Sequence, residues 1–150
     1  MYYSVFDVSE WFLTKEKMCL KKLASLCYYA QAWSYVLHNE ILINDTEFQA
    51  WVHGAMSPHL YERYKNYDWW DKLAPTGREV IFDKTTLELL HSVYLTYGEF
   101  SANSLECMIT AEPPWINARK GYERDDSCTV AISLKDMGSF YSSICKEDFR

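Results

Sequence analysis

The stretch LASLCYYAQAWSYVL, residues 23–37, contains no charged side chain. An apolar stripe at three- and four-residue spacing runs along it and just ahead of it: Cys19, Leu23, Leu26, Ala30, Trp33 and Leu37. Tyr28, Tyr29, Tyr35 and Val36 widen that stripe to nearly the whole helix circumference. A helix that is apolar on all sides lies in the centre of a core or faces a partner. This one is too short and too rich in Ser, Gln and Tyr to span a membrane, so we expect a central core helix.

Helical patterns surround this stretch on both sides. The spacing of apolar residues predicts helices over residues 4–15, 57–67, 85–98, 102–110 and 133–146, with Pro114 in the first turn of another short helix. Ser4, Ser57 and Ser101 are predicted N-caps, and Thr85 with Glu88 is a predicted capping box. Gly98 is expected in the left-handed position that ends a helix.

One region changes period. In EILINDTEFQAWVHG, residues 40–54, Ile41 and Ile43 alternate, Asn44-Asp45 marks a turn and residues 48–52 are rich in aromatic and β-branched side chains. This pattern predicts a short β-hairpin, after which Gly54 frees the backbone. The expected fold is therefore mainly α: a single compact domain over residues 1–150, with about six to seven helices and a small β-hairpin.

The bulk composition narrows the class of protein. Of 150 residues, 49% are hydrophobic and 24% charged, which indicates a folded core. The net charge is −6 and no run of Lys or Arg exceeds two, which argues against nucleic-acid binding. Aromatic residues make up 17%, so some aromatic surface is expected outside the core. The five cysteines, without a CxxC motif or a secretory signal, indicate reduced thiols in a cytoplasmic protein.

No motif of an enzyme is found. The chain has no HExxH, GxSxG, phosphate-binding loop or GxGxxG, and none of its four histidines lies four residues from another. We therefore expect no catalytic residue, no metal and no cofactor. A small enzyme is kept as an alternative hypothesis. A metal or small molecule bound in a polar pocket lined by His53 or His59 would support it.

The stretch TAEPPWINARKG, residues 110–121, stands out for its prolines, tryptophan and arginine. Glu112, Trp115 and Arg119 lie along one helical edge. Two interpretations remain open. Trp and Arg are enriched in interface hot spots, which favours a partner contact. Alternatively, Trp115 packs into the core while Arg119 pairs with Glu112 or with a helix C-terminus.

Four ordered stretches resemble the Panacea domain, the family of SocA-like and phage-associated GepA-like antitoxins. They are KKLASLCYYAQAW, with a Lys-Leu-x-x-Leu-x-Tyr-Tyr-Ala-Gln signature; FQAWVHGAMSPHLYERYK, with an Ala-Trp-x-x-Gly turn; YGEFSANSLECMI; and TAEPPWINAR. The resemblance covers about residues 5–145. It departs from the family pattern at Ala111, where the family usually has His, at Ala55, where it has Pro, and at Ala24-Ser25, where a Gln-Lys pair is common.

The resemblance implies a non-enzymatic antitoxin that neutralises a cognate protein toxin by direct stoichiometric binding, in some relatives as an adaptor to an ATP-dependent protease. The alternative is a phage or mobile-element protein that inhibits another factor with the same scaffold. No DNA-binding domain or membrane contact is expected, and a homodimer remains open. The predicted partner-binding residues are Trp51, His59, Tyr61, Tyr64, Trp69, Trp115 and Arg119. The predicted structural residues of the family motifs are Lys22, Tyr28, Tyr29, Gln31, Gly54, Gly98, Ser101, Glu112 and Pro114.

Overall fold

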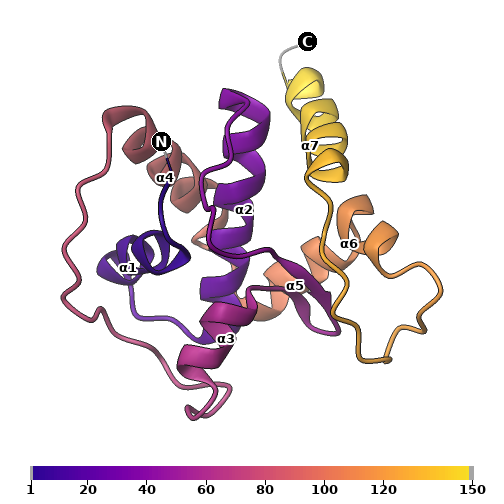
Figure 1. The fold of residues 1–150 in the computed structure, drawn as a ribbon, viewed down its shortest axis with the longest axis horizontal. Helices are drawn as coiled ribbons and strands as arrows, with labels where there is room; N and C mark the ends of the chain where they lie inside the picture. The colour runs from indigo at the N-terminus through magenta and orange to yellow at the C-terminus, as the bar shows by residue number, and fades with distance from the viewer. Residues whose placement is uncertain (1, 149–150) are drawn as a thin grey trace.

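In a computed structural model of the chain, which describes residues 2–148, one long helix is surrounded by the others (Figure 1). This central helix is α2 (Leu20–His38), which packs against α1 (Val5–Lys15), α3 (Pro58–Tyr64), α4 (Lys84–Tyr97), α5 (Ala102–Thr110) and α7 (Leu134–Asp148). A short helix, α6 (Pro113–Ala118), joins α5 to the long loop before α7. Residues 2–148 thus form seven helices and one small sheet, confirming the expected mainly α architecture.

The charge-free stretch is buried as its sequence predicts. Every side chain from Leu23 to Ala32 is buried, and most of these have no solvent exposure at all. The helix is most exposed at its last turn, where Leu37 lies at the surface, and Asn39 follows in the left-handed conformation. No helix among the described residues has both the length and the apolar character needed to cross a lipid bilayer.

Three of the four predicted N-caps are confirmed. The hydroxyl groups of Ser4, Ser57 and Ser101 accept hydrogen bonds from backbone amides in the first turns of α1, α3 and α5. The fourth prediction was wrong, since α4 is capped by Asp83, whose carboxylate accepts from the Thr86 amide. The Asp83 amide also donates to the hydroxyl of Tyr3, a contact between residues 80 positions apart that sequence spacing does not reveal.

The β-hairpin exists, but it lies further along the chain than predicted. Strand β1 (Gln49–Trp51) pairs with β2 (Gly54–Met56) around a turn at Val52-His53, and Gly54 has a φ of 117°. The segment expected as its first strand instead lies against α2. There the Gln31 amide group accepts from the backbone of Leu42 and Ile43 and donates to the Ile43 carbonyl.

Gly98 follows α4 in a right-handed conformation, so the predicted left-handed position was wrong. Its φ is −67°, and a Cβ built there would lie 2.4 Å from the Tyr94 carbonyl oxygen and 2.7 Å from the Tyr94 ring. Close approach, not backbone conformation, therefore requires glycine. The Gly98 carbonyl accepts a 2.7 Å hydrogen bond from Lys22 Nζ, which ties the end of α4 to α2.

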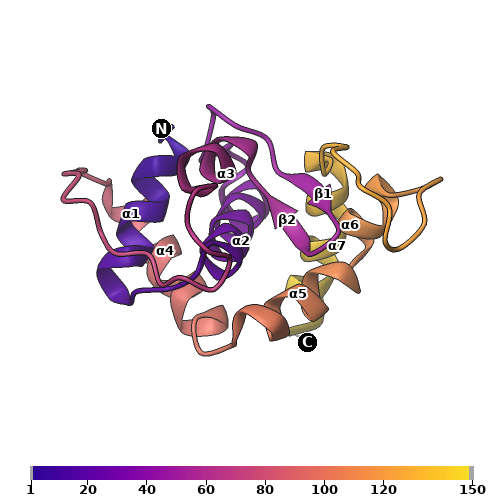
Figure 2. The ribbon, with the colours of Figure 1, turned by 90° about the horizontal axis from the view of Figure 1, so that it is seen from below.

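A long connection without regular structure, residues 65–83, covers α1. The buried carboxylate of Glu10 in α1 holds it by accepting from the amide and hydroxyl of Thr76 and from the Gly77 amide, at 2.8–3.1 Å. The hairpin lies between α2 and α3 on one side and α6 and α7 on the other, with α5 alongside (Figure 2). The start of the covering connection, which carries Trp69 and Trp70, thereby comes next to the hairpin.

Candidate partner-binding site

Aromatic side chains gather around the hairpin. The Trp51 ring meets the Tyr61 ring of α3 at 4.9 Å in an edge-on contact, and the His53 ring lies 6.4 Å from that of Trp69. Trp70 follows with 63% of its surface exposed. We call this set, Trp51, His53, Tyr61, Trp69 and Trp70, the hairpin face. Tyr and Trp are enriched where proteins bind partners, because they combine a large apolar area with a polar tip.

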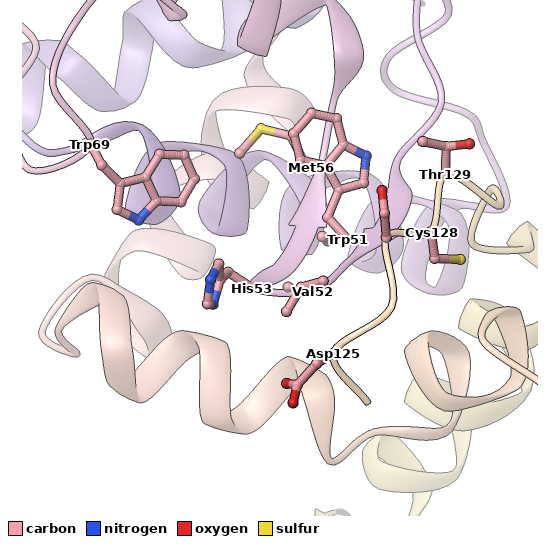
Figure 3. A pocket seen from close by; sticks show the side chains of 11 residues that line it. Trp51, Val52, His53, Met56, Trp69, Asp125, Cys128 and Thr129 are labelled. Atoms are coloured by element: carbon pink, nitrogen blue, oxygen red, sulfur yellow. The ribbon is translucent and has the colours of Figure 1, made fainter. Parts of the chain in front are cut away.

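A cavity of about 330 Å³ opens on the hairpin face. Figure 3 shows Trp69 on one side of it and Cys128 and Thr129 on the other, with Trp51 and Met56 between them. The lining residues come from the hairpin, from Trp69 and from the loop after α6: Trp51, Val52, His53, Gly54, Ala55, Met56, Trp69, Asp125, Ser127, Cys128 and Thr129. Three separate segments therefore build one concave, largely apolar surface.

An ion cluster supports the hairpin turn from the α5 side. The Glu106 carboxylate binds the Lys21 ammonium at 2.6 Å and His53 Nδ1 at 3.3 Å. Burial alone would raise the pKa of Glu106, but the hydrogen bonds from Lys21 and His53 outweigh it and lower the pKa. Lys21 itself is buried, donates to Asn103 Oδ1 and lies 5.3 Å from the Trp70 ring. The cluster thus positions both the turn and Trp70.

Behind the hairpin lies a second group of conspicuous residues, Glu112, Trp115 and Arg119, which we call the buried corner. The Trp115 indole donates a 2.9 Å hydrogen bond to the Trp51 carbonyl, and the ring is 5% exposed. The Arg119 guanidinium, also 5% exposed, donates to the Ala50 carbonyl at 2.8 Å. It donates further to the carbonyls of Glu123, Arg124 and Asp126. Arg119 thereby joins strand β1 to the loop that forms one wall of the cavity.

Glu112 does not pair with Arg119. Its carboxylate Oε1 accepts from the hydroxyl of Tyr29 at 2.9 Å and from that of Tyr141 at 2.8 Å. Burial raises the pKa of Glu112, while these two hydrogen bonds act in the opposite direction. Burial likewise raises the pKa of Tyr28, Tyr29 and Tyr141, and the nearby Glu112 charge adds to it. This network connects the start of α6 to α2 and α7.

A family model described as antitoxin SocA-like, Panacea domain, matches residues 23–116. The chain belongs to this family. No curated protein and no solved structure matches the chain. The matched range is narrower than the predicted resemblance over residues 5–145; it runs from α2 into α6 and includes the whole hairpin face. Arg119 and the cavity wall formed by residues 125–129 lie beyond it.

The structure divides the predicted partner-binding residues of this Panacea protein into three groups. Trp51, Tyr61 and Trp69 come together on the hairpin face, where each is at least partly exposed. His59 is exposed elsewhere on α3, in a shallow depression that it shares with Phe6. The remaining three predicted residues are buried: Tyr64, Trp115 and Arg119. A partner that binds the protein in this conformation can therefore contact mainly Trp51, Tyr61, Trp69 and His59 among the predicted residues.

Several of the predicted structural residues of the Panacea motifs lie at contacts between elements, whereas Ser101 caps its own helix. Pro114 is buried in the first turn of α6, and Tyr29 stacks on Tyr97 with ring centroids 3.9 Å apart. Tyr28 shares a hydrogen bond with Tyr141 at 3.1 Å. Sequence reasoning missed the second wall of the cavity, because Asp125 and Thr129 lie in a polar loop whose sequence has no period or motif.

The described residues include no cluster of three or more His, Cys, Asp or Glu side chains arranged to hold a metal ion. His53 and His59 lie in different places, the first at the cavity and the second in the depression on α3. All five cysteines are free thiols, and burial raises the pKa of Cys27.

Proposed function

We propose that this SocA-like Panacea protein is an antitoxin that neutralises a cognate protein toxin by direct, stoichiometric binding through the hairpin face. The observation that carries the proposal is the family match, whose range contains every residue of that face. Exposed aromatic side chains next to a concave apolar surface are typical of binding hot spots. The role is non-enzymatic: inhibition results from occupying the toxin, and the proposed location is the cytoplasm.

The arrangement of rigid elements supports tight binding. Trp51 is held at its backbone by Trp115 and at its indole by the Gln49 side chain, at 2.8 Å. Tyr61 packs against it from a helix with a confirmed N-cap. Because these side chains are already positioned before binding, little side-chain entropy is lost on association, which favours affinity.

The test is co-expression with the adjacent reading frame in the source genome. We expect rescue of growth and co-purification of a one-to-one complex with the wild-type protein. Tyr61→Ala and Trp69→Ala should each weaken co-purification at least tenfold, in line with hot-spot losses of about 2 kcal/mol. Tyr2→Ala is the matched control, since Tyr2 is 62% exposed and lies outside the hairpin face. Unchanged toxicity in the presence of wild-type protein would rule the proposal out.

A role as a proteolytic adaptor is a finer form of the same proposal. It predicts that the toxin half-life falls when this protein is co-expressed, and that the fall disappears in cells lacking the relevant ATP-dependent protease. A toxin that is neutralised but has the same half-life in both strains identifies steric inhibition instead.

A further inference from the structure

We propose that Glu106 is a positioning residue of the hairpin face: its carboxylate fixes the hairpin turn, Trp69 and Trp70 relative to one another, so that partner binding depends on a group that is itself mostly buried. The use of this face in binding rests on the proposed antitoxin function. The positioning role rests on one feature of the structure, which is that basic side chains from three separate segments meet at this carboxylate.

The turn of the hairpin needs a support of its own. Strands β1 and β2 have three residues each, and an isolated two-stranded hairpin is marginally stable at best. The buried corner holds the carbonyls of Ala50 and Trp51 in β1. The two turn residues, Val52 and His53, follow these contacts and are held from the α5 side instead.

Both turn residues are linked to one oxygen of Glu106. His53 contacts it directly, with Nδ1 3.3 Å from Oε2. The Val52 carbonyl accepts a 2.8 Å hydrogen bond from Arg124, whose guanidinium lies 3.8 Å from the same Oε2. This oxygen therefore fixes the turn through a side chain and through the backbone.

The same carboxylate also reaches the tryptophans beside the turn. Oε1 of Glu106 binds the Lys21 ammonium at 2.6 Å, and this ammonium lies 5.3 Å from the centre of the Trp70 ring. A cation is attracted to an aromatic face, so Lys21 restrains an indole that is 63% exposed. The His53 ring lies 6.4 Å from that of Trp69. Each tryptophan is thus adjacent to one basic residue that Glu106 holds.

Charge explains why a carboxylate is needed at this point. Lys21 and Arg124 carry positive charges, and only 6% of the Lys21 side chain is exposed. Without Glu106 the two cations would repel each other, and a nearly buried ammonium would have lost its anion, which is strongly unfavourable. Asn103 Oδ1 would still accept from Lys21, but it carries no charge. We therefore expect Lys21 to move away from Trp70 and the turn to lose both of its links.

Fluorine NMR of protein labelled with 5-fluorotryptophan tests the positioning role without the toxin. The chain has six tryptophans, and replacing each in turn by phenylalanine assigns its signal. Glu106→Gln should move the signals of both Trp69 and Trp70 by more than a linewidth. Glu16→Gln is the matched control, because Glu16 is also paired with a lysine of α2 but lies against α4. It should leave both signals in place.

Variants of the basic residues separate the two tryptophans. His53→Ala should move the Trp69 signal and Lys21→Met the Trp70 signal, whereas Glu106→Gln moves both. If neither signal moves in Glu106→Gln, or if the Glu16 control moves them equally, the proposal is overturned.

Toxin binding gives a second readout. Glu106→Gln should weaken co-purification with the product of the adjacent reading frame about tenfold, since the freed side chains must be ordered on association. The double variant with Lys21→Met removes the buried cation together with its anion, so it should remain folded, which thermal unfolding verifies, and should bind as weakly. Glu16→Gln should bind as the wild type does. A folded double variant with wild-type binding overturns the proposal.

The two proposals fail separately. If the toxin co-purifies with the wild type and equally with both Glu106 variants, the positioning role is wrong and the antitoxin role stands. If the wild type neutralises no toxin, the antitoxin role is wrong, and the fluorine spectra decide the positioning role alone.

Discussion

The buried corner and the hairpin face use the same kinds of residue for opposite purposes. Trp115 and Arg119 are each 5% exposed, and their polar groups have partners within the protein. Trp70 and Asp125, on or beside the hairpin face, are exposed, and Asp125 has no ion pair with any described residue. The two regions are joined through the Trp51 and Ala50 carbonyls, which accept from the corner. The type of residue therefore does not distinguish structural from binding roles in this protein. What distinguishes them is whether the side chain is buried with its polar groups hydrogen-bonded inside the protein.

The largest expected effect is at Arg119. Arg119→Met should lower the free energy of unfolding by about 3–5 kcal/mol, because several buried carbonyl groups lose their donor at once. Urea unfolding measures the loss, and Lys120→Met, at an exposed neighbour, is the matched control. A loss below about 1 kcal/mol would mean that the corner does not hold the hairpin and the following loop together.

Replacing one tryptophan from each region sharpens the comparison. Trp115→Phe should cost about 1.5–3 kcal/mol, since the Trp51 carbonyl loses a hydrogen bond and the smaller ring leaves a void. Trp69→Phe should change stability by less than about 0.5 kcal/mol, as expected for a substitution towards the surface. Thermal unfolding of both variants under one condition makes the comparison, and equal losses would contradict it.

The half-buried carboxylate of Glu112 predicts a pH effect on stability. The folded-state pKa of Glu112 is raised above its ordinary value of 4.5, so the folded protein binds this proton more tightly than the unfolded chain. The stabilising contribution is complete below about pH 4.5 and is lost as the pH rises through the raised pKa. Each unit of the shift corresponds to about 1.4 kcal/mol.

Glu112→Gln removes the titration and keeps an acceptor for Tyr29 and Tyr141. Relative to this variant, the wild type should become progressively less stable as the pH rises above about 4.5, measured by urea unfolding at a series of pH values. Glu79→Gln, at an exposed position, should leave the pH profile unchanged. A difference that grows as the pH falls would show that the shift has the opposite sign.

The smallest expected effect on stability is at Trp70. Trp70→Ala should alter the free energy of unfolding by less than about 0.5 kcal/mol, because 63% of the side chain is exposed. If the antitoxin proposal is right, the same change should weaken toxin co-purification several-fold. The opposite pattern, lower stability with unchanged binding, would show that Trp70 has a structural role like the residues of the buried corner.

Local patterns predicted much of the fold. The charge-free run predicted the central helix, and serine followed by a helical period predicted three N-caps, because these features depend on neighbours within one or two turns. The hairpin was predicted but misplaced. Residues 41–43 do not form a strand of the hairpin because the Gln31 side chain forms hydrogen bonds with the backbone of residues 42 and 43.

The candidate site was predictable only in part. The excess of aromatic residues pointed to the region of Trp51, Tyr61 and Trp69, but their spacing says nothing of Asp125 or Thr129, more than 50 positions away. For the same reason the sequence left two interpretations of Trp115 and Arg119 open. The contacts that distinguish them, to the Trp51 and Ala50 carbonyls, join residues 64 and 69 positions apart.

The sequence by itself thus determined the helical class, the central helix and the family, since each is written in short-range periodicity and motif. Tertiary structure alone decided which tryptophans are buried, which carboxylate is compensated and where the cavity forms. Burial and hydrogen-bond satisfaction depend on which distant segments meet, and that is settled by packing around α2 rather than by any neighbouring residue.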